Sequence, residues 1–359
     1  MDIVVMPGDG IGPEITGATL KVLQAVNRAF GLDIRYEVHE IGLATLKTVG
    51  TTLPPAVVER ARAVDGAILG PMSSFDYPSR AEGGINQSAE FRIGFDLYAN
   101  IRPCRSRPGL SLSRTPMDLI IVRENTEGFY SDRNMYAGTG EFMPTPDMAM
   151  SVRKITAHAC ERVTRTAFEL ARGRRKKVTA VHKANVLKLS DGLFLREVRK
   201  VAAEFPDIQL DELIVDAAAA ILIRDAQRFD VIVTTNMFGD ILSDEASELS
   251  GSLGLAGALN AGSDYAVAQA QHGSAPDIAG RDRANPVSLI LSSAMLLDWL
   301  GARQRNNALN NAAAAINRAV DQALADPATR TPDIGGPLGT ARFGEVVSQA
   351  VISQAARAA

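Results

Sequence analysis

Short strand-like runs alternate with helical ones from the start of the chain, and this alternation constrains the fold more than any other feature. Strand-like runs occupy residues 3–6, 34–38 and 66–69, and helical patterns lie between them at 14–30 and 55–63. A strand, a helix and a further strand in succession build a parallel sheet. The sequence therefore predicts an α/β fold with much parallel sheet.

The same alternation continues through the middle of the chain, and the later part is mostly helical. Strand-like runs are predicted at residues 97–102, 119–123, 149–156, 178–182, 209–215 and 231–235. Helices are predicted at residues 157–172, 186–205, from 217 onward, and over most of 286–324. With 359 residues, the chain is long enough for two domains.

Composition excludes several classes of protein. With 46% hydrophobic and 22% charged residues and a net charge of −3, the chain has ordinary globular composition and no basic surface for nucleic acid or anionic membrane. The longest apolar stretch, residues 288–300, is too short to span a bilayer. Cys104 and Cys160 form no CxxC motif, and residues 3–6 lack the basic flank of a signal peptide. We expect a cytoplasmic protein.

Two aspartates follow the strand-like run at 231–235. Asn236 is a candidate N-cap for a helix on which Asp240 and Asp244, four residues apart, share one face. Like charges on one face destabilise a helix unless a cation lies between them, and Mg²⁺ or Mn²⁺ prefers carboxylate oxygens. Taken alone, these residues fit a solvated acidic face better than a metal site.

Three arginines occupy the ends of predicted elements. Arg92 lies on a predicted helix, and Arg102 and Arg123 end strand-like runs. Guanidinium groups bind carboxylates through two parallel hydrogen bonds. Each arginine alone is explained by a structural Asp or Glu partner, whereas the three together suit a substrate with two or more carboxylates.

Further polar residues follow predicted strands. Tyr130 lies beyond a turn, Lys183 at a strand-to-helix junction, and Asp216 at the carboxyl end of a strand, where α/β proteins place ligand chemistry. A Tyr or Lys whose pKa is lowered by nearby positive charge serves in proton transfer. A solvated lysine is the alternative for Lys183.

Three loops stand out. The first, Pro7-Gly8-Asp9-Gly10-Ile11-Gly12, follows a strand but matches the dinucleotide fingerprint poorly. In the second, residues 271–280, small residues permit close backbone approach and Asp277 is suited to a ribose diol. The third, residues 131–146, is too long for a routine connection and is predicted to be a lid or an arm that clasps a partner.

Together these motifs resemble the isocitrate/isopropylmalate dehydrogenase family of β-decarboxylating dehydrogenases, from residues 7–12 to Asp333-Ile334-Gly335-Gly336. The resemblance implies a two-domain α/β fold around a large mixed sheet that is not a Rossmann fold. It implies a discontinuous cofactor-binding domain, residues 1–98 plus 252–359. It also implies a central domain, residues 99–251, with the dimer interface and an arm at 131–146.

The resemblance also implies roles for individual residues. Arg92, Arg102 and Arg123 look like carboxylate clamps, and Tyr130 looks like the general acid. Lys183 of the partner subunit looks like the base, so the protein is expected to be a homodimer with shared active sites. Asp240, Asp244 and the partner subunit's Asp216 look like ligands of Mg²⁺ or Mn²⁺.

The resemblance implies NAD as the coenzyme. Asn185 is expected near the nicotinamide, and the loop that looks like the adenosine site comprises His272, Gly273, Ser274, Ala275, Pro276 and Asp277, with Asn285 following. A carboxylate at Asp277 would repel the 2′-phosphate of NADP.

The implied reaction is oxidative decarboxylation of a 3-substituted malate. Isopropylmalate enzymes usually carry bulky aliphatic residues at the positions of Ser88 and Ala89, whereas isocitrate enzymes carry Ser and Asn at the positions of Asn86 and Ser88. This chain has the same two polar residue types in reversed order, which favours a polar or carboxylate-bearing 3-substituent, as in isocitrate or homoisocitrate. Isopropylmalate is the second candidate, and another 3-alkylmalate or tartrate stays open. Some relatives are regulatory subunits that lose site residues; this chain keeps Tyr130, Lys183 and the three aspartates, which favours an enzyme.

Overall fold

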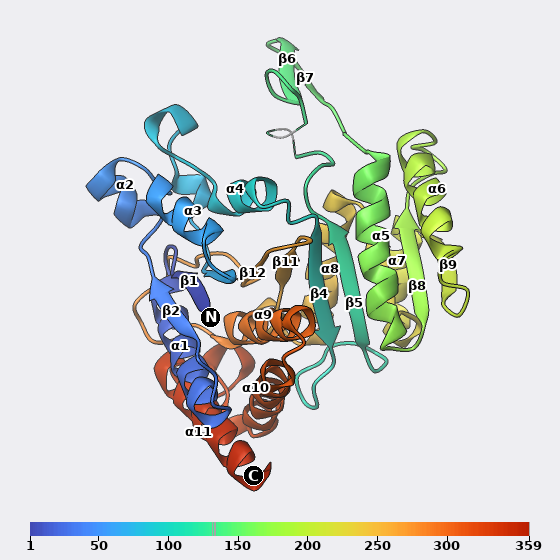
Figure 1. The fold of residues 1–359 in the computed structure, drawn as a ribbon. Coiled ribbons are helices and arrows are strands. Elements are labelled where there is room, and N and C mark those ends of the chain that lie inside the picture. Colours follow the sequence, from blue (N-terminus) through green and yellow to red (C-terminus); the bar gives the residue numbers. More distant parts are fainter. Residues whose placement is uncertain (131, 133, 359) are drawn as a thin grey trace. The chain divides into compact units, whose positions relative to one another are not determined.

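The computed structural model describes residues 1–130, 132 and 134–358 (Figure 1). The chain forms two compact units. Unit 1 comprises Met1–Phe95, Arg107–Ser111 and Gly251–Ala359, and unit 2 comprises Asp96–Ser106 and Leu112–Ser250. Each unit carries strands of a mixed sheet together with helices, which confirms the predicted α/β class.

The strands of unit 1 run in the order β2-β1-β3-β12-β11. Strand β1 (Asp2–Met6) pairs in parallel with β2 (Arg35–Val38) and β3 (Gly66–Leu69), and β12 (Ala266–Gln269) pairs in parallel with β3. Strand β11 (Leu259–Ala261) is antiparallel to β12. Val4, Val5 and Met6 are fully buried, as expected for a central strand covered on both faces.

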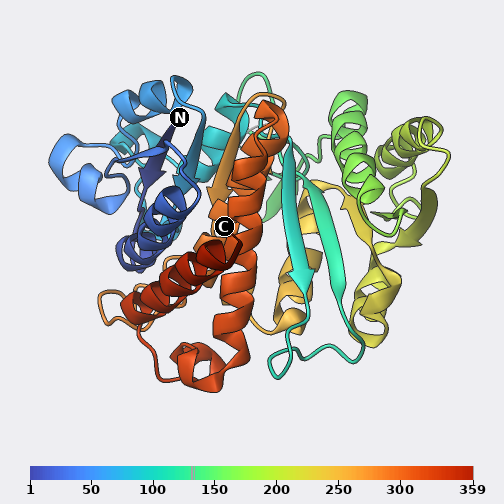
Figure 2. The ribbon, with the colours of Figure 1, turned by 60° about the horizontal axis from the view of Figure 1, so that its bottom comes forward.

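Helices from both ends of the sequence complete unit 1. They are α1 (Gly12–Ala29), α2 (Leu43–Val49), α3 (Pro55–Arg62), α4 (Gln87–Gly94), α9 (Val287–Gln304), α10 (Asn307–Ala325) and α11 (Thr340–Ala358). Helix α1 packs along α11, so a helix from the start of the chain is held by one from its far end (Figure 2). The apolar residues of helix α9 face strand β12 and helix α10.

The strands of unit 2 run in the order β4-β5-β10-β8-β9. Strand β4 (Ala99–Arg105) is antiparallel to β5 (Asp118–Glu124), whereas β5, β10 (Val231–Thr234), β8 (Lys177–His182) and β9 (Gln209–Ile214) are parallel. Helices α5 (Ala157–Arg172) and α6 (Ser190–Ala202) cover one face, and α7 (Val215–Arg224) and α8 (Asn236–Ser250) cover the other (Figure 1). The shared core includes Ile121, Phe229, Ile232 and Leu242.

Two predicted elements of unit 2 are shorter than expected. Helix α6 begins at Ser190 rather than at residue 186, because the amides of Val186 and Leu187 both bond to the Lys183 carbonyl and form a turn. Val186 and Leu189 are 65% and 89% exposed, so this turn has no apolar face to bury. The strand predicted over 149–156 ends at Ser151, which pairs with Glu141, the first residue of its antiparallel partner.

The segment predicted to be an arm contains a β-hairpin. Strands β6 (Glu141–Thr145) and β7 (Met148–Ser151) form a separate two-stranded sheet. This hairpin extends away from the helices of unit 2 (Figure 1). Phe142 pairs with Met150, and Met148 lies on the same face of the hairpin. These three side chains are 45–51% exposed. Residues 131 and 133 of the predicted arm lie outside the described residues.

Candidate active site

The polar residues predicted in unit 2 gather at one edge of its sheet. Parallel strands β5, β10, β8 and β9 all end at this edge, and their registers align Arg123 with Thr234 and Thr234 with Val181. Lys183 follows β8 and Asp216 follows β9. In α/β proteins, ligands bind beyond the carboxyl ends of such strands.

Arg123 is held by the side chain of Asn236, which was predicted to cap helix α8 instead. The Asn236 side-chain carbonyl accepts hydrogen bonds from Arg123 Nε and Nη2 at 2.9 and 2.7 Å, and its amide donates to the Glu127 carbonyl at 2.8 Å. Asn236 is buried and is the first residue of α8. The N-cap predicted at Asn236 is therefore wrong, because this amide is used to orient the arginine.

Helix α8 approaches Arg123 closely at a glycine. A Cβ atom at Gly239 would lie 2.7 Å from both Cβ and Cγ of Arg123. Any larger residue would displace either the arginine or the helix that carries Asp240 and Asp244. Gly239 was not predicted from the sequence, since the contact depends on how α8 packs on β5.

Arg102 faces the same helix. Its Nη1 donates to the Ser243 hydroxyl at 2.7 Å and to Asp244 at 3.1 Å, and lies 3.3 Å from Asp240. Burial, together with the nearby charge of Arg123, lowers the pKa of Arg102 to about 10, against the opposing effect of Asp240 and Asp244. The guanidinium therefore stays charged at neutral pH.

The Tyr130 hydroxyl lies between a cation and an anion. It accepts from Arg123 Nη2 at 2.5 Å and donates to Asp240 Oδ2 at 2.9 Å, and Asp240 also pairs with Arg123 Nη1. A neighbouring guanidinium favours the phenolate and a neighbouring carboxylate favours the phenol. This hydroxyl is placed to exchange a proton with a ligand bound by the arginines.

The side chains of Asp240 and Asp244 are accessible carboxylates, which are the kind of ligand that a hard divalent cation prefers. Both are carboxylates on one face of α8, and their side chains are 38% and 50% exposed. Across residues 1–130, 132 and 134–358 of a single chain, no three His, Cys, Asp or Glu side chains are arranged to hold a metal ion. The third predicted ligand, Asp216, pairs instead with Lys183 of its own chain.

Lys183 and Asp216 form their own ion pair. Lys183 Nζ lies 2.9 Å from Asp216 Oδ1, and this hydrogen bond lowers the pKa of the Asp216 carboxyl. The two residues follow neighbouring strands, β8 and β9, while β10 separates β8 from the strand that carries Arg123. Asn185 is exposed in the turn after Lys183.

The predicted specificity residues lie on helix α4 of unit 1. Asn86 caps this helix by accepting from the Ala89 amide at 3.0 Å. Ser88 donates to Gln269 Oε1 at 3.1 Å, and Asn260 donates to the same oxygen at 3.0 Å. Arg92, half-buried, lies one turn after Ser88. This face of α4 is polar at the positions where the sequence predicted a polar pocket.

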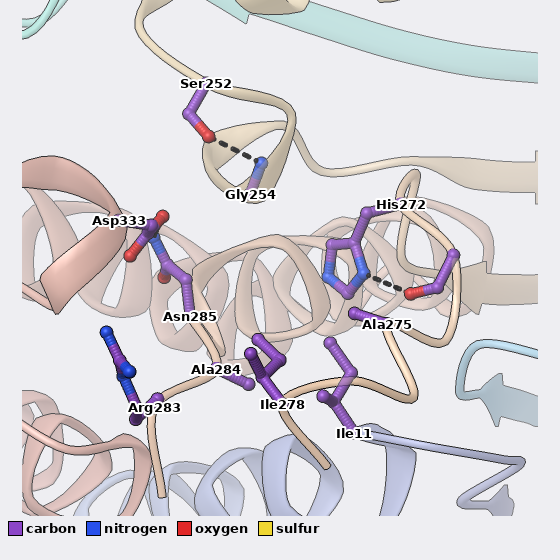
Figure 3. Close-up of a pocket in the computed structure, with 11 residues that line it drawn as sticks. Ile11, Ser252, Gly254, His272, Ala275, Ile278, Arg283, Ala284, Asn285 and Asp333 are labelled. Carbon is purple, nitrogen blue, oxygen red and sulfur yellow. Dashed lines mark hydrogen bonds between the residues drawn. The ribbon is translucent and has the colours of Figure 1, made fainter. Parts of the chain in front are cut away.

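The predicted cofactor loop borders a cavity of about 230 Å³ in unit 1 (Figure 3). Its lining includes four predicted residues: His272, Gly273, Ala275 and Asn285. Asn285 donates to Asp333 Oδ2 at 3.0 Å. Burial lowers the pKa of His272, so its imidazole is neutral at pH 7. A largely apolar lining with a few polar groups suits a nucleoside.

The other predicted residues of this loop, Ser274, Pro276 and Asp277, adjoin the cavity without lining it. Ser274 is buried behind it, where its hydroxyl accepts from Ser73 at 2.9 Å and its carbonyl accepts from the Ile11 amide at 2.8 Å. Gly10 belongs to the same contact, since a Cβ there would lie 2.0 Å from the Ser274 carbonyl oxygen. Pro276 and Asp277 are exposed, between the lining residues Ala275 and Ile278.

Sequence reasoning missed several residues that line the cavity: Ile11, Ser252, Gly254, Ile278, Arg283, Ala284 and Asp333. Ile11 and Asp333 belong to the motifs at the two ends of the matching region, so the sequence could have identified them. Arg283 had no signal of its own, because a lone arginine in a loop is ordinary.

Comparison with known proteins gives a consistent result. The isocitrate/isopropylmalate dehydrogenase family model matches residues 2–347. The chain is 42% identical to an isocitrate/homoisocitrate dehydrogenase of Thermus thermophilus, over 98% of both chains. It is 41% identical to a 3-isopropylmalate dehydrogenase of Methanothermobacter thermautotrophicus, over 95% of both. A crystal structure of isocitrate dehydrogenase from Methylococcus capsulatus matches with a TM-score of 0.85, at 40% identity, over 98% of this chain and 99% of that one.

Proposed function

Because the chain belongs to the isocitrate/isopropylmalate dehydrogenase family, we propose that it oxidises and decarboxylates a 3-substituted malate whose 3-substituent carries a carboxylate. The observation that carries this proposal is the cluster in unit 2, where the buried guanidiniums of Arg102 and Arg123 face Asp240, Asp244 and Tyr130 at the carboxyl edge of the sheet. Fixed guanidiniums suit a polycarboxylate. Carboxylates beside them suit a divalent cation.

Each residue has a role in this proposal. Arg102 and Arg123, with Arg92, hold the substrate carboxylates. Lys183 of the partner subunit removes the hydroxyl proton as the hydride leaves C2, and Tyr130 protonates the carbon that has lost CO₂. Asp240, Asp244 and the partner subunit's Asp216 would hold Mg²⁺ or Mn²⁺, which as a Lewis acid stabilises negative charge on the substrate oxygens.

The shared site requires a homodimer. The Lys183–Asp216 pair and the Arg123–Asp240 cluster are separated by strand β10 within one chain, and each is incomplete alone. The exposed apolar face of the β6–β7 hairpin supplies a surface for the second copy. We place the protein in the cytoplasm because its two cysteines, Cys104 and Cys160, are both free thiols. Within the described residues, no helix has the length and apolarity to cross a membrane.

NAD is the proposed coenzyme, bound in the cavity of unit 1. Asp277 adjoins the lining residue Ile278, and its carboxylate would hydrogen-bond a ribose diol and repel a 2′-phosphate. One observation favours NADP as the second candidate. The exposed Arg283 lines the same cavity, and an arginine would pair with a 2′-phosphate.

The substrate follows from the polar face of α4. Ser88, Gln269 and Asn260 form a hydrogen-bonded group where an isopropyl substituent would need apolar contacts. The names of the relatives do not decide between substrates, since both specificities occur at about 40% identity.

The deciding experiment measures reduced coenzyme with Mg²⁺ or Mn²⁺ on isocitrate, homoisocitrate, isopropylmalate, D-malate and tartrate, each with NAD⁺ and with NADP⁺. Turnover of a tricarboxylate with NAD⁺ supports the proposal. A preference for isopropylmalate overturns the polar-pocket assignment. If the enzyme prefers NADP⁺, and this preference is lost in Arg283→Met but kept in the matched variant Arg281→Met, then Arg283 determines the coenzyme preference.

A further inference from the structure

A buried ion pair lies behind the Lys183 turn. Arg153, which follows strand β7, pairs with Asp191 in the first turn of α6. The Arg153 side chain is 8% exposed and that of Asp191 is fully buried. Breaking a buried pair leaves an uncompensated charge, so both side chains are strongly constrained in position.

Asp191 connects this pair directly to the residue that carries the proposed base. Its Oδ1 accepts from Arg153, and its Oδ2 accepts from the backbone amide of Lys183 at 2.5 Å. Residues 183–189 form an exposed turn. The Asp191 carboxylate therefore fixes the backbone from which the Lys183 side chain extends to Asp216.

Arg153 connects the same pair to the strand that leads into α8. Its Nη2 donates to the Thr235 hydroxyl at 2.9 Å, and Thr235 precedes Asn236, which holds Arg123. Its guanidinium also lies 5.7 Å from the ring of Phe129, which precedes Tyr130 in the sequence. It lies 5.2 Å from the ring of Phe238, two residues before Asp240. One buried guanidinium thus contacts segments that adjoin the Arg123–Asp240 cluster of one proposed site, and through Asp191 it is connected to the Lys183 that this chain supplies to the other site.

We propose that Arg153 and Asp191 are positioning residues that fix the Lys183 turn relative to the start of α8. They do not touch the substrate; they hold the backbone from which the proposed base and the proposed metal ligands extend. This inference rests on the proposed function, because it assigns Lys183 to catalysis. A displacement of about 1 Å at a reacting group can cost about 100-fold in rate.

A second ion pair of the same build provides the control. At the opposite ends of β8 and β10, Arg174 donates to the fully buried Asp230 at 2.8 Å, and Asp230 also accepts from the Lys177 amide at 3.4 Å. This pair has the same chemistry but lies at the edge away from the site. Arg174→Met and Asp230→Asn should each lose stability and keep kcat.

The test compares Arg153→Met, Asp191→Asn and the double variant with the control pair. We expect kcat to fall about 10-fold to 100-fold in each single variant, with an unchanged KM for NAD⁺, because the coenzyme cavity is in unit 1. The double variant leaves no unpaired buried charge, so its melting temperature should recover while kcat stays low. Recovery of kcat together with stability would show a purely structural pair and overturn the proposal.

A measurement without substrates separates this inference from the proposed function. In Asp191→Ala, the Lys183 amide should exchange its hydrogen several-fold faster, with the change confined to the turn at 183–189. Exchange that is unchanged overturns the positioning role even if the enzyme is active. If the wild-type protein turns over no substrate, the proposed function fails, and hydrogen exchange still decides what Asp191 holds.

Discussion

Tyr130 is the proposed general acid, and its hydroxyl joins Arg123 to Asp240. Tyr130→Phe removes the proton donor and keeps the ring that packs 5.4 Å from the Arg123 guanidinium. We expect kcat to fall about 100-fold or more, the usual effect of losing a general acid. Steady-state kinetics on the preferred substrate measure this effect. Tyr36→Phe, in strand β2, is the matched control and should keep kcat.

Glu127 should make the stability of the protein depend on pH. It is buried beside Glu124 and accepts from the amide and hydroxyl of Thr156. Burial, with the nearby Glu124 charge and against the bonds from Thr156 and the charge of Lys154, raises the Glu127 pKa from 4.5 to about 7. Between these two values the folded chain holds one more proton than the unfolded chain.

The free energy of unfolding should therefore decrease as pH rises through this window. Glu127→Gln, which is neutral at every pH, should lose this dependence, whereas the exposed Glu59→Gln should retain it. Melting temperatures of the three proteins between pH 4.5 and 7.5 measure the effect. Parallel curves for wild type and Glu127→Gln would show that Glu127 titrates normally.

At the scale of elements, the sequence predicted those whose pattern is local. Helix α5 and strand β3 have the predicted bounds, because strong periodicity and clear flanking residues define them. Strands β11 and β12 were missed; they are three and four residues long, and only pairing in the sheet defines them. Helix α11 was also missed, since its buried positions are set by packing against α1.

The same distinction applies to the site. The sequence singled out Arg102, Arg123, Tyr130, Asp240 and Asp244, and the structure places these five together. It did not identify Asn236 as the group that orients Arg123, nor Arg283 as part of the cavity wall. Both depend on which side of an element faces a neighbour, and sequence spacing does not determine this.

The β6–β7 hairpin should be an assembly element. Phe142, Met148 and Met150 expose one apolar face, which a monomer would leave in water. Met148→Ser/Met150→Ser should shift the protein toward monomer and reduce activity in parallel, as measured by sedimentation and kinetics at the same concentrations. Val49→Ser on helix α2, which replaces a still more exposed apolar residue, is the control. A stable, active dimer in the hairpin variant would place the interface elsewhere.

At the scale of the whole molecule, shared sites predict complementation between inactive chains. Lys183→Met and Tyr130→Phe should each be nearly inactive as homodimers. After random reassortment, half of the dimers are mixed, and in each of these one of two sites receives both functional residues. About a quarter of wild-type activity should then return, if the two-fold symmetric dimer exchanges subunits freely.

The measurement mixes the two purified variants under conditions that exchange subunits and follows NADH formation over time. Mixing either variant with the double variant Tyr130→Phe/Lys183→Met is the control, since no pairing of those chains completes a site. Activity that stays at the level of the separate variants would mean that Lys183 and Tyr130 act within one chain.

The discontinuity of unit 1 also has a consequence for how the protein is made. Strand β3 ends at Leu69, but its neighbour β12 begins only at Ala266. Likewise, helix α1 packs on α11, which is synthesised last. At about 5–20 residues per second, ribosomal synthesis of the intervening chain takes on the order of 10–40 s. Unit 2 can fold during this interval, whereas β1, β2 and β3 await their partners. The first strands to emerge are therefore among the last to be completed, and they are the segment most exposed to chaperones.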